Sequence, residues 1–204
     1  MDKKIIYDDF QLEGLDVRIA SHKGAVVFIG LGEAGDSRGS EDWFSVRFGG
    51  DLVRAKDEDK DRALLDTAAR EIGEYLRGDR EVFDFPIELN GTPFQKQVWK
   101  EMLMIPYGET ISYQQLARLV GSPKAARAVG GAVAANRIGI CVPCHRICPS
   151  TGETGEFAWG AHIKKRLIEL ESLARRRSEL QKVIDMAESD PGCESPIGEG
   201  IESC

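Results

Sequence analysis

The residues best suited to chemistry in this chain are a thiol and an imidazole side by side, in the tetrapeptide Pro143-Cys144-His145-Arg146. A cysteine thiol has an unperturbed pKa of about 8.5, so a nearby proton acceptor can make it nucleophilic near neutral pH. The apolar run before it, residues 138–142, predicts an extended strand, on which neighbouring side chains point apart. A buried structural cysteine beside a loop histidine is the competing interpretation.

Three other motifs offer different chemistry. Cys141 to His145 spell C-x-x-C-H, which is typical of c-type haem attachment, but that chemistry normally needs export and the N-terminus lacks a signal peptide's apolar stretch. Cys141, Cys144, His145 and Cys148 could be counted as metal ligands, but structural zinc sites usually draw theirs from two separated pairs. Residues 30–35 fit G-x-G-x-x-G, a pattern that binds dinucleotides when it opens a helix. The residues after them predict a loop instead, so this interpretation is not favoured.

Short helices are predicted ahead of the tetrapeptide. A first helix is expected to begin at Pro93, with Thr92 as its N-cap. Ser112 is expected to cap a helix over residues 113–120, and a further helix is expected over residues 123–134. The short link between the last two predicts a helix-turn-helix.

The last of these helices is nearly bare of long side chains apart from Lys124 and Arg127. Tight packing against the rest of the protein is the ordinary explanation of such an Ala/Gly-rich helix. The functional explanation is a helix in a DNA groove, with Arg127 as the probing side chain. Residues 90–171 carry 10 Lys/Arg against 6 Asp/Glu in a chain of net charge −7, and a locally basic module can still bind phosphate.

The first part of the chain predicts a sheet and one helix. Apolar and polar side chains alternate over residues 15–20, residues 21–24 predict a turn, and residues 25–29 are apolar, so residues 15–29 predict a hairpin. Residues 43–48 predict another strand. A helix is expected over residues 58–77, with Asp57 as its N-cap. The polar, acidic residues 178–204 predict a mobile tail.

Composition limits the class of protein. No apolar run is long enough to span a bilayer, and five cysteines, an odd number, do not predict a disulfide framework. We therefore expect a soluble protein with reduced thiols, cytoplasmic in a prokaryote or otherwise nuclear, and not secreted.

Five ordered blocks resemble the O6-alkylguanine-DNA alkyltransferases, also called methylated-DNA–protein-cysteine methyltransferases. The blocks are residues 111–117, residues 124–131, Asn136, the tetrapeptide and residues 165–171. The resemblance covers residues 90–171, whereas residues 1–85 match only in general character. It implies an α/β (α+β) fold, with an N-terminal sheet-and-helix domain over residues 1–85, for which a ribonuclease-H-like arrangement is one candidate. A mainly helical DNA-binding domain with the helix-turn-helix follows over residues 90–172.

The resemblance implies a DNA repair reaction that each molecule performs once. Cys144 would take the alkyl group from O6 of guanine, with O4 of thymine as a second candidate, and keep it as a thioether. A relay of Glu171, His145, a water molecule and Cys144 would raise thiolate character. No cofactor or metal is expected. Some relatives bind zinc through Cys and His of the N-terminal domain, but residues 1–85 contain no Cys, and His22 is their only His. The expected partner of a monomer is double-stranded DNA containing O6-alkylguanine, with no membrane.

The match also assigns roles to surrounding residues. Because the target carbon cannot be reached in the base stack, the nucleotide would be flipped out from the minor groove, at a cost of roughly a few kcal/mol. Arg127 would fill the space left behind, and Tyr113 would turn the backbone and protonate the departing guanine. Asn136 would tie the recognition helix to the strand carrying Cys144. Further DNA contacts are expected from Ser112, Gln114, Ala125 and Ala126. The pocket is expected to be lined by Val133, Val142, Ile147, Thr154, Gly155, Phe157 and Ala158.

Several alternatives stay open at this point. Asn136 could equally be an ordinary helix C-cap, and Glu171 a solvated helix charge. Ala158 and Pro149 differ among relatives, which leaves the preferred alkyl group undecided. A module that recognises alkylated bases without repairing them would lack the acceptor cysteine, whereas Cys144 is present. A cysteine hydrolase would turn over repeatedly.

Overall fold

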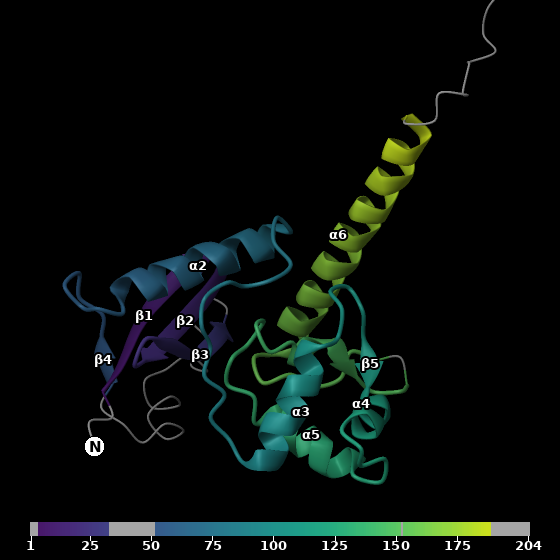
Figure 1. Ribbon diagram of the computed structural model, residues 1–204, viewed down its shortest axis with the longest axis horizontal. Coiled ribbons are helices and arrows are strands. Elements are labelled where there is room, and N and C mark those ends of the chain that lie inside the picture. The colour runs from purple at the N-terminus through teal and green to yellow at the C-terminus, as the bar shows by residue number, and fades with distance from the viewer. Residues whose placement is uncertain (1–3, 33–51, 152, 189–204) are drawn as a thin grey trace, which may run out of the picture.

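The computed structural model describes residues 4–32, 52–151 and 153–188. Its first layer is a four-stranded sheet in the order β3-β2-β1-β4 (Figure 1). Neighbouring strands are antiparallel except β4, which runs parallel to β1. The strands are β1 (Ile5–Leu12), β2 (Leu15–His22), β3 (Ala25–Gly32) and β4 (Leu52–Arg54).

The hairpin predicted over residues 15–29 is confirmed as β2 and β3. Its turn places Lys23 and Gly24 at φ 51° and 80°, and Glu13 and Gly14 make a similar turn at φ 50° and 78° between β1 and β2. Strand β1 was not predicted from the sequence. The strand expected over residues 43–48 and the loop expected over residues 36–40 lie outside the described residues.

Helix α2 (Arg62–Arg77) lies across one face of the sheet (Figure 1). It begins at Arg62 and not at residue 58, so the N-cap prediction for Asp57 is wrong. The carboxylate of Asp59 accepts the Lys56 N–H at 2.8 Å, and this local turn delays the first helical residue. Gly78 ends the helix in the left-handed conformation, as expected.

The helix-turn-helix is confirmed as α4 (Tyr113–Leu119) and α5 (Ala126–Ala134), which follow α3 (Pro93–Leu103). Thr92 caps α3 and Ser112 caps α4, each in a reciprocal capping box. Helix α5 begins later than the predicted residue 123. The carbonyl of Ser122 accepts the Ala125 N–H at 2.8 Å, so residues 122–125 form a turn first.

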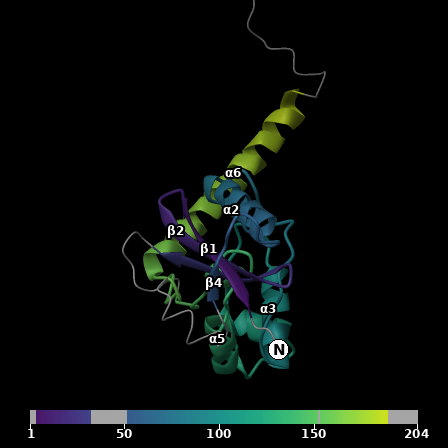
Figure 2. The ribbon, with the colours of Figure 1, turned by 90° about the vertical axis from the view of Figure 1, so that its left-hand side faces the viewer.

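The remaining elements are short except the last. Strands β5 (Ile111–Ser112) and β6 (Ile147–Cys148) form a parallel pair, and η2 (Cys144–Arg146) is a 3-10 helix. Helix α6 (Ala161–Glu188) projects away from the body, and α5 lies at the far end from its last turns in both views (Figures 1 and 2). None of the described helices is long and apolar enough to cross a membrane.

Helix α6 extends into the predicted tail. Side-chain pairs four residues apart support its last turns, between Arg175 and Glu179 at 2.9 Å and between Gln181 and Asp185 at 2.7 Å. Residues 178–188 are therefore helical, and the rest of the predicted tail, residues 189–204, lies outside the described residues.

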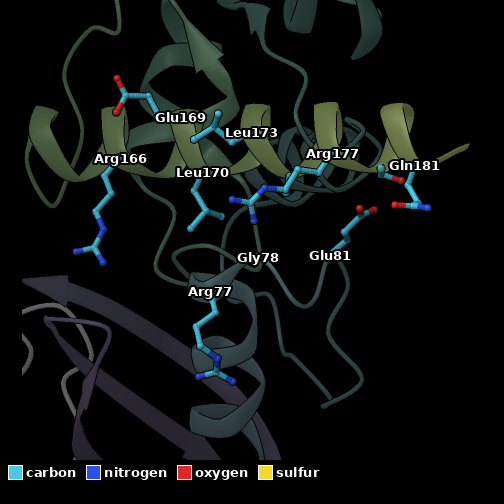
Figure 3. A pocket seen from close by; sticks show the side chains of 11 residues that line it. Arg77, Gly78, Glu81, Arg166, Glu169, Leu170, Leu173, Arg177 and Gln181 are labelled. Carbon is cyan, nitrogen blue, oxygen red and sulfur yellow. The ribbon is translucent and has the colours of Figure 1, made fainter. Parts of the chain in front are cut away.

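Helix α6 and the end of α2 enclose a groove of about 630 Å³ (Figure 3). Leu170 of α6 points toward Gly78, while Leu173 and Arg177 are exposed on the same helix. Arg166 of α6 donates to the Glu13 carbonyl at 2.5 Å, which ties the helix to the β1–β2 turn. The groove therefore lies where α6 meets the first layer of the fold.

One hydrophobic core joins the two predicted domains, whose boundary near residues 85–90 stays a prediction. Ile29 of β3 donates to the Arg137 carbonyl and accepts from the Gly139 N–H, both at 2.9 Å. A Cβ on Gly139 would lie 3.0 Å from the Ile29 oxygen, so glycine permits this close approach. The sheet edge thus holds the segment that leads to Cys144.

Candidate active site

Cys144 lies at the start of the 3-10 helix η2, so the expectation that it sits on an extended strand is wrong. The chain before it turns tightly, because Cys141 N donates to the Gly139 carbonyl and Val142 N donates to the Ile138 carbonyl. Ile140 takes a positive φ of 64° within this turn. The apolar residues 138–142 are buried as a compact turn instead of a strand.

The side chain of Asn136 holds this turn together. Its Nδ2 donates to the Val142 carbonyl at 2.9 Å and to Cys144 Sγ at 3.1 Å, and its Oδ1 accepts the Ile138 N–H at 3.1 Å. Asn136 is buried and follows Ala135, the C-cap of α5. Its side chain therefore connects α5 to the thiol, which is more than a helix C-cap would do.

The Cys144 thiol is almost completely buried. Burial raises its pKa to about 11, although the Asn136 amide and the Lys164 ammonium favour the thiolate. The resting thiol is therefore protonated near neutral pH and needs a proton acceptor at the moment of attack.

His145 and Glu171 form a buried pair. His145 Nε2 lies 2.7 Å from Glu171 Oε1, and His145 is fully buried. Burial lowers the pKa of His145 although the carboxylate opposes this, so the imidazole is neutral near pH 7. With Nε2–H donated to Glu171, Nδ1 keeps its lone pair. No atom of the described residues hydrogen-bonds this buried Nδ1.

Glu171 is not a solvated helix charge, since it is 1% exposed and surrounded by donors. Arg146 donates from Nε and Nη2 at 3.0 and 2.9 Å, the Gly108 N–H donates at 2.9 Å, and the Tyr75 hydroxyl donates to Oε1. Burial alone would raise the pKa of Glu171, but the hydrogen bonds from His145 and Arg146 hold it at about 2. The carboxylate therefore stays ionised beside His145.

Three residues of the site were missed by the sequence analysis as contributors. Arg146 was read only as part of the tetrapeptide, and Tyr75 only as a core residue of a helix. Lys164 is 1% exposed and donates to the Ile147 carbonyl at 2.6 Å. Burial lowers the pKa of Lys164, although a negative charge on Cys148 or Cys144 opposes this. No local sequence signal separates a buried lysine here from the exposed Lys165 beside it.

A pocket of about 410 Å³ opens onto Cys144. It brings together five of the predicted residues: Tyr113, Val133, Cys144, Phe157 and Ala158. Gly130, Ala134 and Glu156 complete the lining. Burial, and then the neighbouring Cys148, Cys144 and Glu156, raises the pKa of Tyr113, so its phenol keeps its proton near neutral pH.

The other predicted pocket residues lie elsewhere. Val142 and Ile147 are fully buried in the core. Thr154 lines a separate cavity of about 440 Å³ that also contains Ser112 and Cys148. Gly155 has φ 73°, and a Cβ on it would meet the Pro149 ring at 2.7 Å. None of these four residues lines the pocket at Cys144.

The residues predicted to contact DNA gather around the start of α4 and α5. Arg127 and Gln114 are exposed, Ala125 and Ala126 are partly exposed, and the Ser112 hydroxyl caps α4. Helix α5 buries Val129, Ala132 and Val133, and the Trp99 indole donates to the Ala132 carbonyl at 2.8 Å. The opposite side of α5 exposes Arg127, Ala128, Gly131 and Ala134. One face of this smooth helix packs on α3 and the other is free for a ligand.

The residues that could be counted as metal ligands, three cysteines and His145, all lie in the described part of the chain. Cys141, Cys144 and Cys148 are free thiols, and no three His, Cys, Asp or Glu side chains of the described residues are grouped as metal ligands. His145 instead uses Nε2 to contact Glu171.

Comparison with known proteins identifies related sequences. A family model described as the DNA-binding domain of 6-O-methylguanine DNA methyltransferase matches residues 93–173. An inducible methylated-DNA–protein-cysteine methyltransferase of Bacillus subtilis is 39% identical over 133 residues, covering 65% of this chain and 72% of that protein. A methylated-DNA–protein-cysteine methyltransferase of Methanosarcina barkeri is 46% identical over 104 residues, covering 51% of this chain and 66% of that protein.

The fold is also similar to solved structures. A crystal structure of Mycobacterium tuberculosis OGT in complex with DNA superposes with a TM-score of 0.65 at 30% identity. The alignment covers 84% of this chain and 94% of that chain, which is more of the chain than the family model matches.

Proposed function

Because the chain belongs to the methylated-DNA–protein-cysteine methyltransferase family, we propose that it repairs O6-alkylguanine in duplex DNA by moving the alkyl group onto Cys144. One observation carries the proposal: the buried Cys144 thiol lines a pocket, and the next residue, His145, forms a buried pair with Glu171 of α6. The pocket is large enough for a small organic group, and the acceptor cysteine is present.

The first step of the proposed reaction makes the nucleophile. The thiol proton passes through a water molecule to His145 Nδ1, and Glu171 stabilises the imidazolium that forms. The buried Nδ1, which has no hydrogen-bond partner in the described part of the chain, supports this route, as does the ionised Glu171 carboxylate at the other ring nitrogen. The sulfur then attacks the alkyl carbon, a C–S bond forms, and the bond from that carbon to O6 breaks.

The second requirement is a proton for the departing guanine. The electron pair of the broken bond stays on the base, and the Tyr113 phenol donates a proton to the ring. Tyr113 lines the same pocket as Cys144 and is protonated near neutral pH, which supports this role. The product thioether has no acceptor for its alkyl group, so each chain acts once.

The exposed face of α5 supports binding of the duplex. Helix α5 presents small residues and one long cation, Arg127, so it can approach a groove closely while Arg127 occupies the space of the flipped nucleotide. The pocket contains Gly130, Val133 and Ala134 of α5, so a base turned out beside this helix would enter it directly.

The test of the proposed function is intact-mass analysis of the protein after mixing with a duplex that contains O6-methylguanine. We expect one added methylene per chain, mapped to the peptide that contains Cys144, and loss of the lesion from the DNA. Unmodified protein with the lesion still present would refute the proposal. More than one lesion removed per chain would favour the hydrolase class instead.

Replacing Arg127 with alanine is expected to slow alkyl transfer by about tenfold or more, because flipping loses the side chain that fills the stack. The Cys144 thiol should be unaffected, since Arg127 is exposed on α5 and does not line the pocket. Single-turnover transfer and labelling of Cys144 by iodoacetamide would measure the two effects separately.

The matched control is Arg177→Ala, which removes the same charge from α6, far from α5 (Figures 1 and 3). Transfer by this variant should equal that of the wild type. Equal rates for Arg127→Ala and the wild type would exclude the flipping role.

A further inference from the structure

We propose that Tyr75 of α2 is a positioning residue for alkyl transfer, whose hydroxyl holds the Glu171 carboxylate in place against His145. The inference rests on the proposed function, because Tyr75 acts on the proton acceptor of that reaction. It also gives the N-terminal part of the chain a role in the chemistry.

The geometry places Tyr75 inside the site. Its side chain is fully buried, and its hydroxyl donates to Glu171 Oε1. The hydroxyl oxygen of Tyr75 also lies 3.3 Å from His145 Nε2. Since His145 Nε2 also lies 2.7 Å from Glu171 Oε1, a single carboxylate oxygen receives both the phenol and the imidazole. The ring of Tyr75 is held edge-on by Tyr107, at a centroid distance of 5.7 Å.

The hydroxyl controls how strongly Glu171 attracts the His145 proton. Burial and the Glu171 charge raise the pKa of Tyr75 well above its usual value, so the phenol stays a donor. A hydrogen-bond donor stabilises the negative charge of a carboxylate. The Tyr75 hydroxyl therefore weakens the attraction of the Glu171 carboxylate for the His145 proton. Loss of the hydroxyl should therefore raise the pKa of His145, while Arg146 Nη2 still donates to Oε1 at 2.9 Å.

The other charged or titratable groups around His145 are identified by the structure. Glu171 and Lys164 approach it from α6, and Arg146 is its neighbour in η2. Arg146 lowers the pKa of Tyr75, and Tyr107 raises it. All of these remain in a Tyr75→Phe variant, so a change in its pH dependence would report the missing hydroxyl.

The experiment compares Tyr75→Phe with Tyr107→Phe. The Tyr107 hydroxyl is buried and has no hydrogen-bond partner among the described residues, so its loss removes the same atom one ring away without disturbing Glu171. Both variants would be assayed for single-turnover transfer across a pH series, with thermal unfolding as the check on folding.

For Tyr75→Phe we expect transfer near neutral pH to slow by about three- to tenfold, which is less than the hundredfold or more expected for loss of the base itself. The acid limb of the pH–rate profile should move to higher pH, because His145 becomes protonated more readily. Tyr107→Phe should keep the wild-type rate and profile.

A readout independent of activity is the NMR titration of the histidines, of which the chain has only 3. The pKa of His145 should rise in Tyr75→Phe and stay unchanged in Tyr107→Phe. A Tyr75→Phe variant with the wild-type profile and the wild-type His145 pKa would overturn the inference, even if it were less stable. Failure of the wild type to transfer would instead refute the proposed function.

Discussion

Replacing Cys144 with alanine is expected to abolish alkyl transfer while leaving DNA binding nearly unchanged. Sγ is the atom that would form the new bond, and no other described thiol lines the pocket at the end of α5. The change deletes one atom from a buried site, which costs stability by about 1 kcal/mol. Asn136 keeps its bonds to Val142 and Ile138, so the turn that holds the site should persist.

The measurement is loss of the lesion from a duplex over a long incubation, together with fluorescence anisotropy for binding. Cys148→Ala is the matched control, because Cys148 lies four residues on and lines the separate cavity with Thr154. The control should transfer at the wild-type rate. Transfer by Cys144→Ala, or an equal loss in Cys148→Ala, would contradict the assignment of the acceptor.

The local features of this site could be predicted because their physical causes are local. Capping boxes at Thr92 and Ser112 fix the starts of α3 and α4 within a few residues of sequence. The hairpin of β2 and β3 follows from alternation and a glycine turn in the same way. The helix-turn-helix and the position of a thiol next to an imidazole in the sequence therefore follow from short patterns.

The contacts that position His145 and Glu171 could not be predicted, because they join distant segments. Tyr75 lies 70 residues before His145 and 96 before Glu171, and its apolar ring on a helical stripe predicts only a core position. The turn before Cys144 was read as a strand, since buried apolar residues suit both. Ile140 at positive φ is a conformation that its residue type does not indicate.

Replacing Glu171 with glutamine is expected to have the largest effect on stability. The change leaves Arg146 buried without its counter-charge, and breaking a buried pair in this way costs about 3–5 kcal/mol. Transfer should also fall by about a hundredfold or more, because the His145 imidazolium loses its stabilising charge. Urea unfolding at pH 7 and single-turnover transfer would measure the two losses.

The pH dependence of this loss has a definite sign. The pKa of Glu171 is about 2 in the folded protein, below its ordinary value of 4.5, so the ionised carboxylate stabilises the fold above about pH 4.5. That stability disappears as the pH falls from 4.5 towards 2. The gap in unfolding free energy between the wild type and Glu171→Gln should therefore narrow on acidification through this window, while other carboxylates affect both proteins equally.

The matched control is Glu169→Gln on the same helix, where the carboxylate is exposed and lies 3.8 Å from Lys165. Exposed pairs contribute about 0–1 kcal/mol, so this variant should unfold within about 0.5 kcal/mol of the wild type and transfer normally. A Glu171→Gln protein as stable as Glu169→Gln at pH 7, or a gap that stays constant down to pH 2, would show that Glu171 is not the charge that holds Arg146 and His145 together.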